Sequence, residues 1–215
     1  WTSCVSSPPG TPEDTVMPSP RSSLSAVLAA GYAGGMTLTG GLEEGTEVTD
    51  LELEDCRIDG GTMERTTWRR CTLDQVTMSG VSLSMGRLVD TRFAECVIRD
   101  SKAQAFAWTG LRASGLADQA VSFERCRLDY GSFMGIDGRG LRFTGCSLVD
   151  ADFGEADLRE VEFVDCDLSG ARFSDADLRG ALFADVRGLS LDPREARTAG
   201  MRVDPSAALD LVTAL

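Results

Sequence analysis

Seven cysteines and 34 acidic residues are the side chains of this sequence best suited to chemistry. Cysteine thiolates bind zinc or act as nucleophiles, but each role requires particular partners. Histidine is absent, which removes the commonest general base and the commonest neutral metal ligand. No two cysteines have the C-x-x-C spacing of a zinc or redox site. The sequence contains neither a nucleophile–base set nor a phosphate-binding glycine loop, so we expect no enzyme, no metal site and no cofactor.

The cysteines instead follow a period of five residues. Alanine and valine occupy the same position of the period elsewhere, so we interpret these cysteines as small buried hydrophobic residues. The odd total of seven cysteines and the expected burial of six of them fit a reducing compartment, and we expect a cytoplasmic protein. Cys4 lies outside the pattern, and the six that share it are Cys56, Cys71, Cys96, Cys126, Cys146 and Cys166.

The same period governs the apolar residues. Phenylalanine recurs every tenth position from Phe123 to Phe183, and leucine falls midway in five of the six intervals, at Leu128, Leu148, Leu158, Leu168 and Leu178. We name this the central lane; a second lane of small apolar residues lies two positions earlier. Residues two apart in extended chain point the same way, so both lanes face inward. Charge is confined to the other three positions, with Asp118 the only charged residue on either lane between Thr46 and Phe183.

This pattern predicts an all-β solenoid over residues 46–185. Cys126, Cys146 and Cys166 are 20 residues apart, which indicates four pentapeptides in each coil. Successive coils stacked as parallel strands rise about 4.8 Å. Such a solenoid presents a surface and not a pocket, so function must be sought on its outside.

One interruption of the period predicts an external loop. Ala113 and Asp118 are poor central-lane residues, and both lie in Thr109–Asp118. Removing those ten residues aligns two columns across the interruption, which are Cys56, Val76, Cys96, Cys126, Cys146 and Cys166, and Leu53, Leu73, Phe93, Phe123, Phe143, Phe163 and Phe183. The alternative is a distorted coil without a loop. Ala103 and Gly138 are weak core positions that the pattern does not explain.

The two ends have different compositions. Residues 1–23 are rich in proline and serine and are expected to form a flexible leader, and 24–45 an N-terminal cap. Residues 186–215 are expected to form an α-helical cap, because Asp192-Pro193 and Asp204-Pro205 each resemble a helix start. The last helix either simply covers the solenoid end or joins two protomers in a homodimer through an apolar face, whose residues are Leu209, Leu211, Val212 and Leu215.

The net charge of −13 argues against direct binding to nucleic acid or to an anionic membrane. Acidic residues are dense on the outward positions of one stretch. They are consistent with a mimic of the DNA phosphate backbone or with an ordinary solvated surface. The acidic residues in question are Asp150, Asp152, Glu155, Asp157, Glu160, Glu162, Asp165 and Asp167.

Three segments carry a family resemblance. The sequences A-D-L-R-G at Ala176–Gly180, A-D-L-R-E at Ala156–Glu160 and C-D-L-S-G at Cys166–Gly170 match the consensus A-(D/N)-L-x-x. The chain therefore resembles the pentapeptide-repeat proteins between Thr46 and Phe183. The resemblance implies a right-handed quadrilateral parallel β-helix; it implies little about function, because this fold serves many proteins.

A narrower resemblance concerns function. The tail D-L-R-G…L-D-P…A-G-M-R-V-D, from Asp177 to Asp204, and the segment S-F-M-G at Ser132–Gly135 are similar to the Qnr and MfpA topoisomerase-protecting proteins. That resemblance implies a dimer joined through its C-terminal helix that binds DNA gyrase or topoisomerase IV, mimics DNA and relieves poisoning by quinolones or related toxins. It also implies that the predicted loop contacts the enzyme, through Leu111, Arg112, Leu116 and Asp118.

Two other interpretations remain open. The loop residues could form an excursion without partners. The protein could instead be a structural or interaction scaffold that binds another basic protein.

Overall fold

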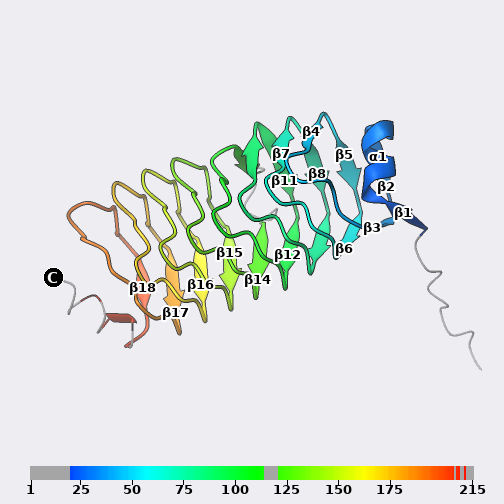
Figure 1. The fold of residues 1–215 in the computed structure, drawn as a ribbon. Coiled ribbons are helices and arrows are strands. Elements are labelled where there is room, and N and C mark those ends of the chain that lie inside the picture. The colour runs from blue at the N-terminus through cyan, green and yellow to red at the C-terminus, as the bar shows by residue number, and fades with distance from the viewer. Residues whose placement is uncertain (1–19, 114–120, 206, 209–210, 212–215) are drawn as a thin grey trace, which may run out of the picture.

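The protein is a parallel β-helix. A computed structural model describes residues 20–113, 121–205, 207–208 and 211. In Figure 1 the chain winds through stacked coils, with short strands of successive coils side by side. Partners in most neighbouring strands are 20 residues apart, as in Phe143↔Phe163, which confirms the predicted four pentapeptides in each coil.

Three of the four sides of the coil carry sheets. The ten-stranded sheet has the order β1-β3-β6-β9-β12-β14-β15-β16-β17-β18, the five-stranded sheet β13-β11-β8-β5-β2 and the three-stranded sheet β10-β7-β4. Isolated parallel bridges such as Thr62↔Ser82 join coils on the remaining side. The strands are β1 Arg21–Ser23, β2 Tyr32–Gly34, β3 Thr37–Thr39, β4 Glu47–Thr49, β5 Glu52–Glu54, β6 Arg57–Asp59, β7 Thr67–Arg69, β8 Thr72–Asp74, β9 Thr77–Ser79, β10 Arg87–Val89, β11 Thr91–Ala94, β12 Val97–Arg99, β13 Leu111–Ala113, β14 Ser122–Glu124, β15 Arg142–Thr144, β16 Glu162–Val164, β17 Leu182–Ala184 and β18 Arg202–Val203.

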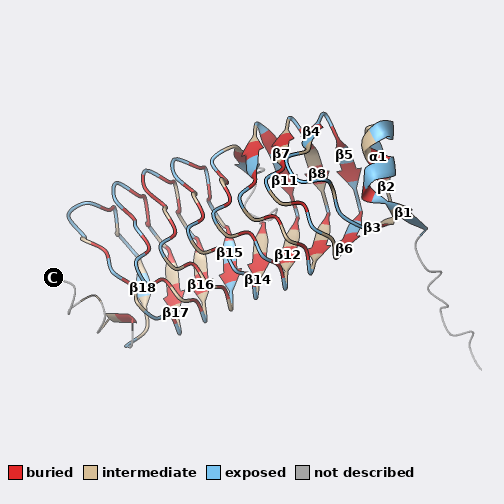
Figure 2. Cartoon of the chain, viewed as in Figure 1, coloured by how far each residue is buried: buried red, intermediate tan, exposed pale blue. Residues whose placement is uncertain are grey.

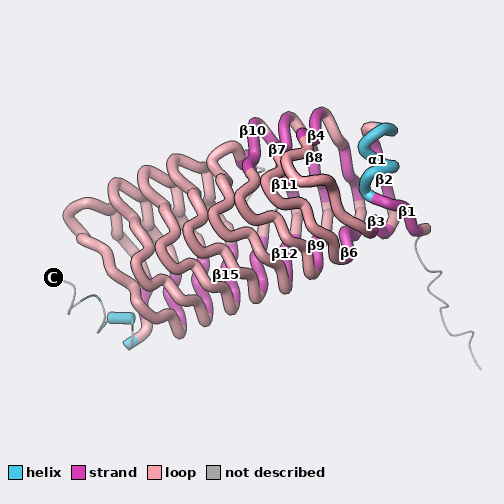
Figure 3. The backbone as a smooth tube through the Cα atoms, viewed as in Figure 1, coloured by secondary structure: helices cyan, strands magenta, loops and turns pink. Residues whose placement is uncertain are grey.

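The strands are short because the chain turns a corner every five residues. Eighteen non-glycine residues in the described part of the chain have φ between 48° and 60°, and all stand two positions after the central lane. This left-handed conformation ends each strand and redirects the chain. Figure 3 shows the resulting alternation of strand and turn along the N-terminal coils.

Within the described residues both inner lanes are buried as predicted, except for the partly buried Thr46 and Gly61 of the second lane. Figure 2 shows buried and accessible residues alternating along the coils. The central phenylalanines form two interleaved stacks inside the solenoid. Phe143 lies nearly parallel to Phe123 and Phe163, with ring centroids 5.0 and 4.9 Å apart, and edge-on to Phe133 and Phe153 at 5.7 and 6.0 Å. Offset and edge-to-face pairs of this kind are the favoured aromatic geometries.

All six cysteines of the period are buried, as predicted. Their thiols donate to inner carbonyl groups; Cys146 Sγ lies 3.3 Å from Phe123 O. Thr91 and Ser101 occupy the same lane and donate to backbone oxygens at 2.9 and 2.6 Å. Burial raises the pKa of the Cys96 thiol to about 12, so this thiol stays protonated near neutral pH.

Two buried tryptophans differ in their hydrogen bonding. The indole N–H of Trp68 donates to Thr66 Oγ1 at 3.0 Å. Phe106 stands two residues before Trp108, where an aromatic ring replaces that hydroxyl, with ring centroids 4.5 Å apart. Nε1 of Trp108 is the buried side-chain nitrogen that lacks a partner among the described residues. Replacing the threonine hydroxyl with the Phe106 ring therefore adds aromatic packing but leaves the indole N–H of Trp108 without a hydrogen-bond acceptor in the described structure.

The predicted loop Thr109–Asp118 is wrong in its bounds. Leu111–Ala113 forms β13 and pairs with β11 in the ordinary 20-residue register. The coil continues because Leu111 is an apolar second-lane residue, 4% exposed. The register then widens to 25 residues, with Ile98 opposite Phe123. Five residues, not ten, are therefore added to the coil between Ala113 and Val121; residues 114–120 lie outside the described part.

The change of register corrects both predicted columns. In the phenylalanine column, Phe123 follows Ile98 and not Phe93. In the cysteine column, Val121 follows Cys96, because the Ser122 N–H donates to Cys96 O. Cys126, Cys146 and Cys166 remain aligned as predicted. Gly138 is now explained. A Cβ atom on it would lie 3.0 Å from Leu141 Cδ1 and from Leu158 Cδ2, so neighbouring side chains fill its place in the core.

The β-helix extends beyond the predicted 46–185 at both ends. In the predicted leader, β1 pairs with β3, and in the predicted cap region β2 and β3 pair with the next coil. Helix α1, Leu24–Ala30, follows β1 and buries Leu24 and Val27 in the core. Ser23 caps it by accepting the N–H of Ala26 at 3.2 Å.

At the other end, no helix starts at Asp192, contrary to the prediction; this described stretch continues the β-helix as one more coil. The Asp192 side chain accepts the Arg194 N–H at 2.8 Å and so closes a turn, while Arg197 and Val203 pair with Asp177 and Phe183 one coil earlier. Pairing to an existing coil satisfies more backbone groups than one isolated helical turn.

Asp204 caps the last segment as predicted. Its carboxylate accepts the N–H of Ala207 at 2.8 Å.

Candidate partner-binding surface

The eight acidic residues singled out in the sequence wind around the coil and do not form one track. Residues 150–167 span almost a whole 20-residue coil, so successive members lie on successive sides. They separate into two chemical classes, one on the flat sides and one at the corners.

The four acids on the sides are neutralised by arginines. Each stands one position before the central lane. Its carboxylate pairs with an arginine that lies either 20 residues away, in a neighbouring coil, or two residues ahead in the same coil. The ion pairs are Asp152–Arg172 at 2.9 Å, Asp157–Arg159 at 2.6 Å, Glu162–Arg142 at 3.4 Å and Asp167–Arg187 at 2.9 Å.

The four acids at the corners have no arginine partner. Asp150, Glu155, Glu160 and Asp165 occupy the four corners of one coil, are exposed and make no ion pair within the described structure. Exposed carboxylates without an ion pair in their own chain are free to pair with cations of a partner. Of the eight acidic residues predicted to form a binding surface, the four corner residues are therefore the better candidates.

Corner acids also align along the rod. Glu155 is followed one coil later by the exposed Asp175, whose N–H donates to Glu195 O at 2.9 Å; we name these three residues the first acidic edge. Asp165 and Asp185 form a second acidic edge, two corners away and hence diagonally opposite. The backbones of neighbouring residues on an edge are one coil apart, roughly 4.8 Å.

Sequence reasoning missed the corner conformation, although every fifth residue is enriched in glycine and aspartate. Those are the residues that tolerate positive φ best, so many corner aspartates have a local structural reason. Glu155 and Glu160 do not, because they adopt φ of 58° and 60° without that preference. Other corners hold residues without this preference as well, such as Gln75 and Glu95, so the local conformation does not explain the choice of glutamate.

A repeated Asp-x-Arg unit forms a paired ladder on one side. Asp137, Asp157 and Asp177 stack through parallel bridges. Each accepts a two-pronged hydrogen bond from the arginine two residues ahead, at 2.8 and 2.6 Å for Arg179 on Asp177. The hydrogen bonds from these arginines hold the pKa of all three carboxyl groups below the ordinary value.

This ladder predicts loss of stability in acid. A depressed folded-state pKa contributes stability that is present above the unfolded value, about 3.9, and is lost as pH falls through the folded pKa. Asp177→Asn should therefore lower the free energy of unfolding at pH 7 and have a much smaller effect near pH 2. Urea denaturation at both pH values measures this. An equal effect at the two values would contradict an ionic role for Asp177, which is 9% exposed.

The predicted loop contacts are only partly described. Leu111 is buried in the core, so its proposed role as a contact residue is wrong. Arg112 is exposed and forms an ion pair with Asp90. Leu116 and Asp118 lie outside the described residues.

Of the predicted dimer contacts, Leu211 is partly buried against the core of its own chain. Leu209, Val212 and Leu215 lie outside the described residues.

Neither a metal cluster nor a membrane-spanning helix occurs among the described residues. No group of three or more cysteine, aspartate or glutamate residues there is arranged to hold a metal ion. No helix in this part of the chain is long and apolar enough to cross a bilayer.

Comparison with known proteins identifies the repeat. Residues 146–185 match the model for pentapeptide repeats in eight copies. No curated protein matches the sequence. The family match covers the coil that carries the four unpaired corner acids.

The chain is also similar to several solved structures. A trypsin-treated variant of QnrB1, described as a plasmid-mediated fluoroquinolone resistance protein, is 17% identical, with 82% of this chain and 95% of that chain covered and a TM-score of 0.46. A second such variant is 15% identical over 85% and 96%, with a TM-score of 0.48. HetL, a pentapeptide-repeat protein of the cyanobacterium Nostoc involved in heterocyst differentiation regulation, is 19% identical over 80% and 84%, with a TM-score of 0.41. Likenesses at this level carry no argument about partners.

Proposed function

We propose that this protein, whose residues 146–185 are pentapeptide repeats, is a non-catalytic binding protein that occupies the DNA-binding surface of a type II topoisomerase. The enzyme is DNA gyrase or topoisomerase IV, the partner implied by the sequence resemblance described above. In this proposal the protein is cytoplasmic and acts as a homodimer joined through its C-terminal helix.

The observation that supports this proposal is the set of unpaired corner carboxylates. A strand of duplex DNA carries one negative charge per 3.4 Å of axis, and the first acidic edge carries one per coil, about 4.8 Å. The rod therefore presents a rigid line of negative charge at lower density than DNA. A basic surface that binds DNA would attract these aligned carboxylates without any base contact, because phosphate contacts supply most of the non-specific affinity for DNA.

Rigidity strengthens the electrostatic argument. The corner residues are held by backbone bonds between coils; the Glu155 N–H lies 2.9 Å from Ser174 O. The line of charge thus exists before binding and loses little conformational entropy on association. A protein that occupies the DNA site would compete with DNA, and in doing so would reduce the cleavage complexes that quinolones or related poisons stabilise.

A supercoiling assay with purified gyrase tests this proposal. The protein at micromolar concentration should inhibit supercoiling, or restore it in the presence of a quinolone. A mutant with Glu155→Gln and Asp175→Asn should lose most of this effect, while Asp152→Asn, which removes a paired acid, should retain it. A wild-type protein without effect on either activity or drug poisoning would contradict the proposal and would favour a scaffold for another basic protein.

A further inference from the structure

One stretch of the otherwise charged surface has no charged side chains. Two successive coils on one side of the rod carry only uncharged outward residues, which we name the neutral window. Its members are Ala105, Ala107, Thr109, Gly110, Tyr130, Ser132, Met134 and Gly135. Parallel bridges order one column as Arg87, Ala107, Ser132 and Asp152, so the window has charged residues on both flanks along the rod.

Large apolar side chains gather at this window. Tyr130, Met85 and Met134 are 61%, 49% and 44% exposed. Met85 and Tyr130 stand at the same corner, on either side of Ala105. The fourth exposed large hydrophobic of the described residues, Tyr32, lies near the N-terminal end. Scattered exposed hydrophobics are ordinary, whereas a cluster bordered by charge marks an interaction site.

The backbone at this corner has the same left-handed conformation as the other corners of the coil. Tyr130 and Met85 both have φ of 59°, a conformation in which bulky side chains are disfavoured. Asparagine or glycine would suit these positions better and would expose no apolar surface. Arginine, glutamine and glutamate also occupy such corners, so it is the exposed apolar surface of Tyr130 and Met85 that distinguishes this corner.

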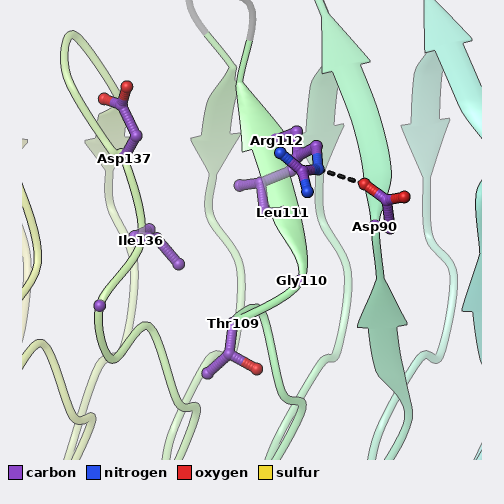
Figure 4. Close-up of a pocket in the computed structure, with 8 residues that line it drawn as sticks. Asp90, Thr109, Gly110, Leu111, Arg112, Ile136 and Asp137 are labelled. Atoms are coloured by element: carbon purple, nitrogen blue, oxygen red, sulfur yellow. Dashed lines mark hydrogen bonds and ion pairs between the residues drawn. The ribbon is translucent and has the colours of Figure 1, made fainter.

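A groove of about 380 Å³ opens beside the window. Figure 4 shows β13 on one side and Ile136–Asp137 on the other, with Gly110 at its base. In the next pair of coils, a backbone hydrogen bond joins the two coils at the corresponding position, where the Asp157 N–H donates to Ile136 O at 2.9 Å. The equivalent pair, the Asp137 N–H and the Leu111 C=O, makes no such bond among the described residues. Both residues line the groove, and backbone groups without an internal partner require one from water or a ligand.

We infer that the neutral window and this groove form the central contact of a protein interface, whose partner presents an apolar side chain flanked by lysine or arginine. Unpaired Asp150 and Glu155 lie directly beside the window, and they complement a basic rim. The window spans two coils, about 10 Å along the rod, which is too small for a stable contact between two copies of this chain. It fits the buried centre of a larger interface with a basic partner.

This inference rests on the proposed function for the identity of the probe, which is purified DNA gyrase. The full chain carrying Tyr130→Asn and Met134→Ser is compared with wild type for gyrase binding. We expect the Kd to rise at least about 10-fold, the loss typical of central contact residues. Tyr32→Thr removes another exposed tyrosine, which lies outside the window, and should change the Kd less than about 2-fold.

A thermal melt of the same variants separates binding from folding. Because asparagine tolerates positive φ, Tyr130→Asn should leave the Tm unchanged or raise it. Wild-type binding with no loss in the double variant would overturn this inference alone. A lowered Tm for Tyr130→Asn would also overturn it, by giving the ring a structural role. Absence of wild-type binding would overturn the proposed function and this inference together.

Discussion

Replacing Phe143 with alanine is expected to lower the free energy of unfolding by about 3–5 kcal/mol. The ring is fully buried and contacts four other rings, with parallel neighbours at 5.0 and 4.9 Å. Backbone bonds between coils fix the spacing on both sides, so the coils cannot collapse into the cavity. The full transfer and cavity costs should therefore be measured by urea denaturation.

Glu160→Ala is the matched control for this core substitution. Glu160 is an exposed corner residue without an ion pair in the described structure, and its loss should change the free energy of unfolding by less than about 0.5 kcal/mol. Comparable losses at Phe143 and Glu160 would contradict the division of the coil into inner lanes and outer corners.

Reversing charge on the first acidic edge is expected to weaken gyrase binding by at least about 100-fold. Glu155→Lys and Asp175→Lys replace two unpaired carboxylates with ammonium groups, so attraction to a basic surface becomes repulsion at both positions. Close charge pairs across interfaces are worth about 1.5–7 kcal/mol. Neither residue is part of the core, so the fold should remain intact, as circular dichroism would check.

The second acidic edge supplies the control. Asp165→Lys and Asp185→Lys change the net charge equally but lie at the diagonally opposite corner. They should reduce the association rate modestly, because net charge steers encounter, and leave the dissociation rate close to wild type. Equal losses from both edges would show that only overall charge matters and would contradict a defined contact face.

The inner lanes could be predicted from sequence because their period leaves little freedom. A five-residue repeat of Phe and Leu fixes which side chains point inward, and Phe143 and Cys146 are buried as expected. The size of the insertion could not be found in the same way, because adding five or ten residues leaves both lanes unchanged. The prediction aligned Cys96 with Cys126, whereas Val121 fills that column equally well.

The functional surface was less predictable for a related reason. Sequence shows that Asp152 and Glu155 are both outward, but not that Arg172 neutralises only the first. That distinction depends on which residue lies one coil away and on the corner conformation of Glu155. Likewise, Asp192-Pro193 has the composition of a helix start, yet pairing of Arg197 to the preceding coil determines the outcome.

The most direct test of DNA mimicry is displacement of DNA from its enzyme. Fluorescently labelled duplex DNA is bound to purified gyrase, and its anisotropy is followed as the protein is added. If the first acidic edge occupies the DNA-binding surface, the anisotropy should fall to that of free DNA, and the apparent Kd for DNA should rise in proportion to protein concentration. Binding of the protein to gyrase while the DNA remains fully bound would contradict this account.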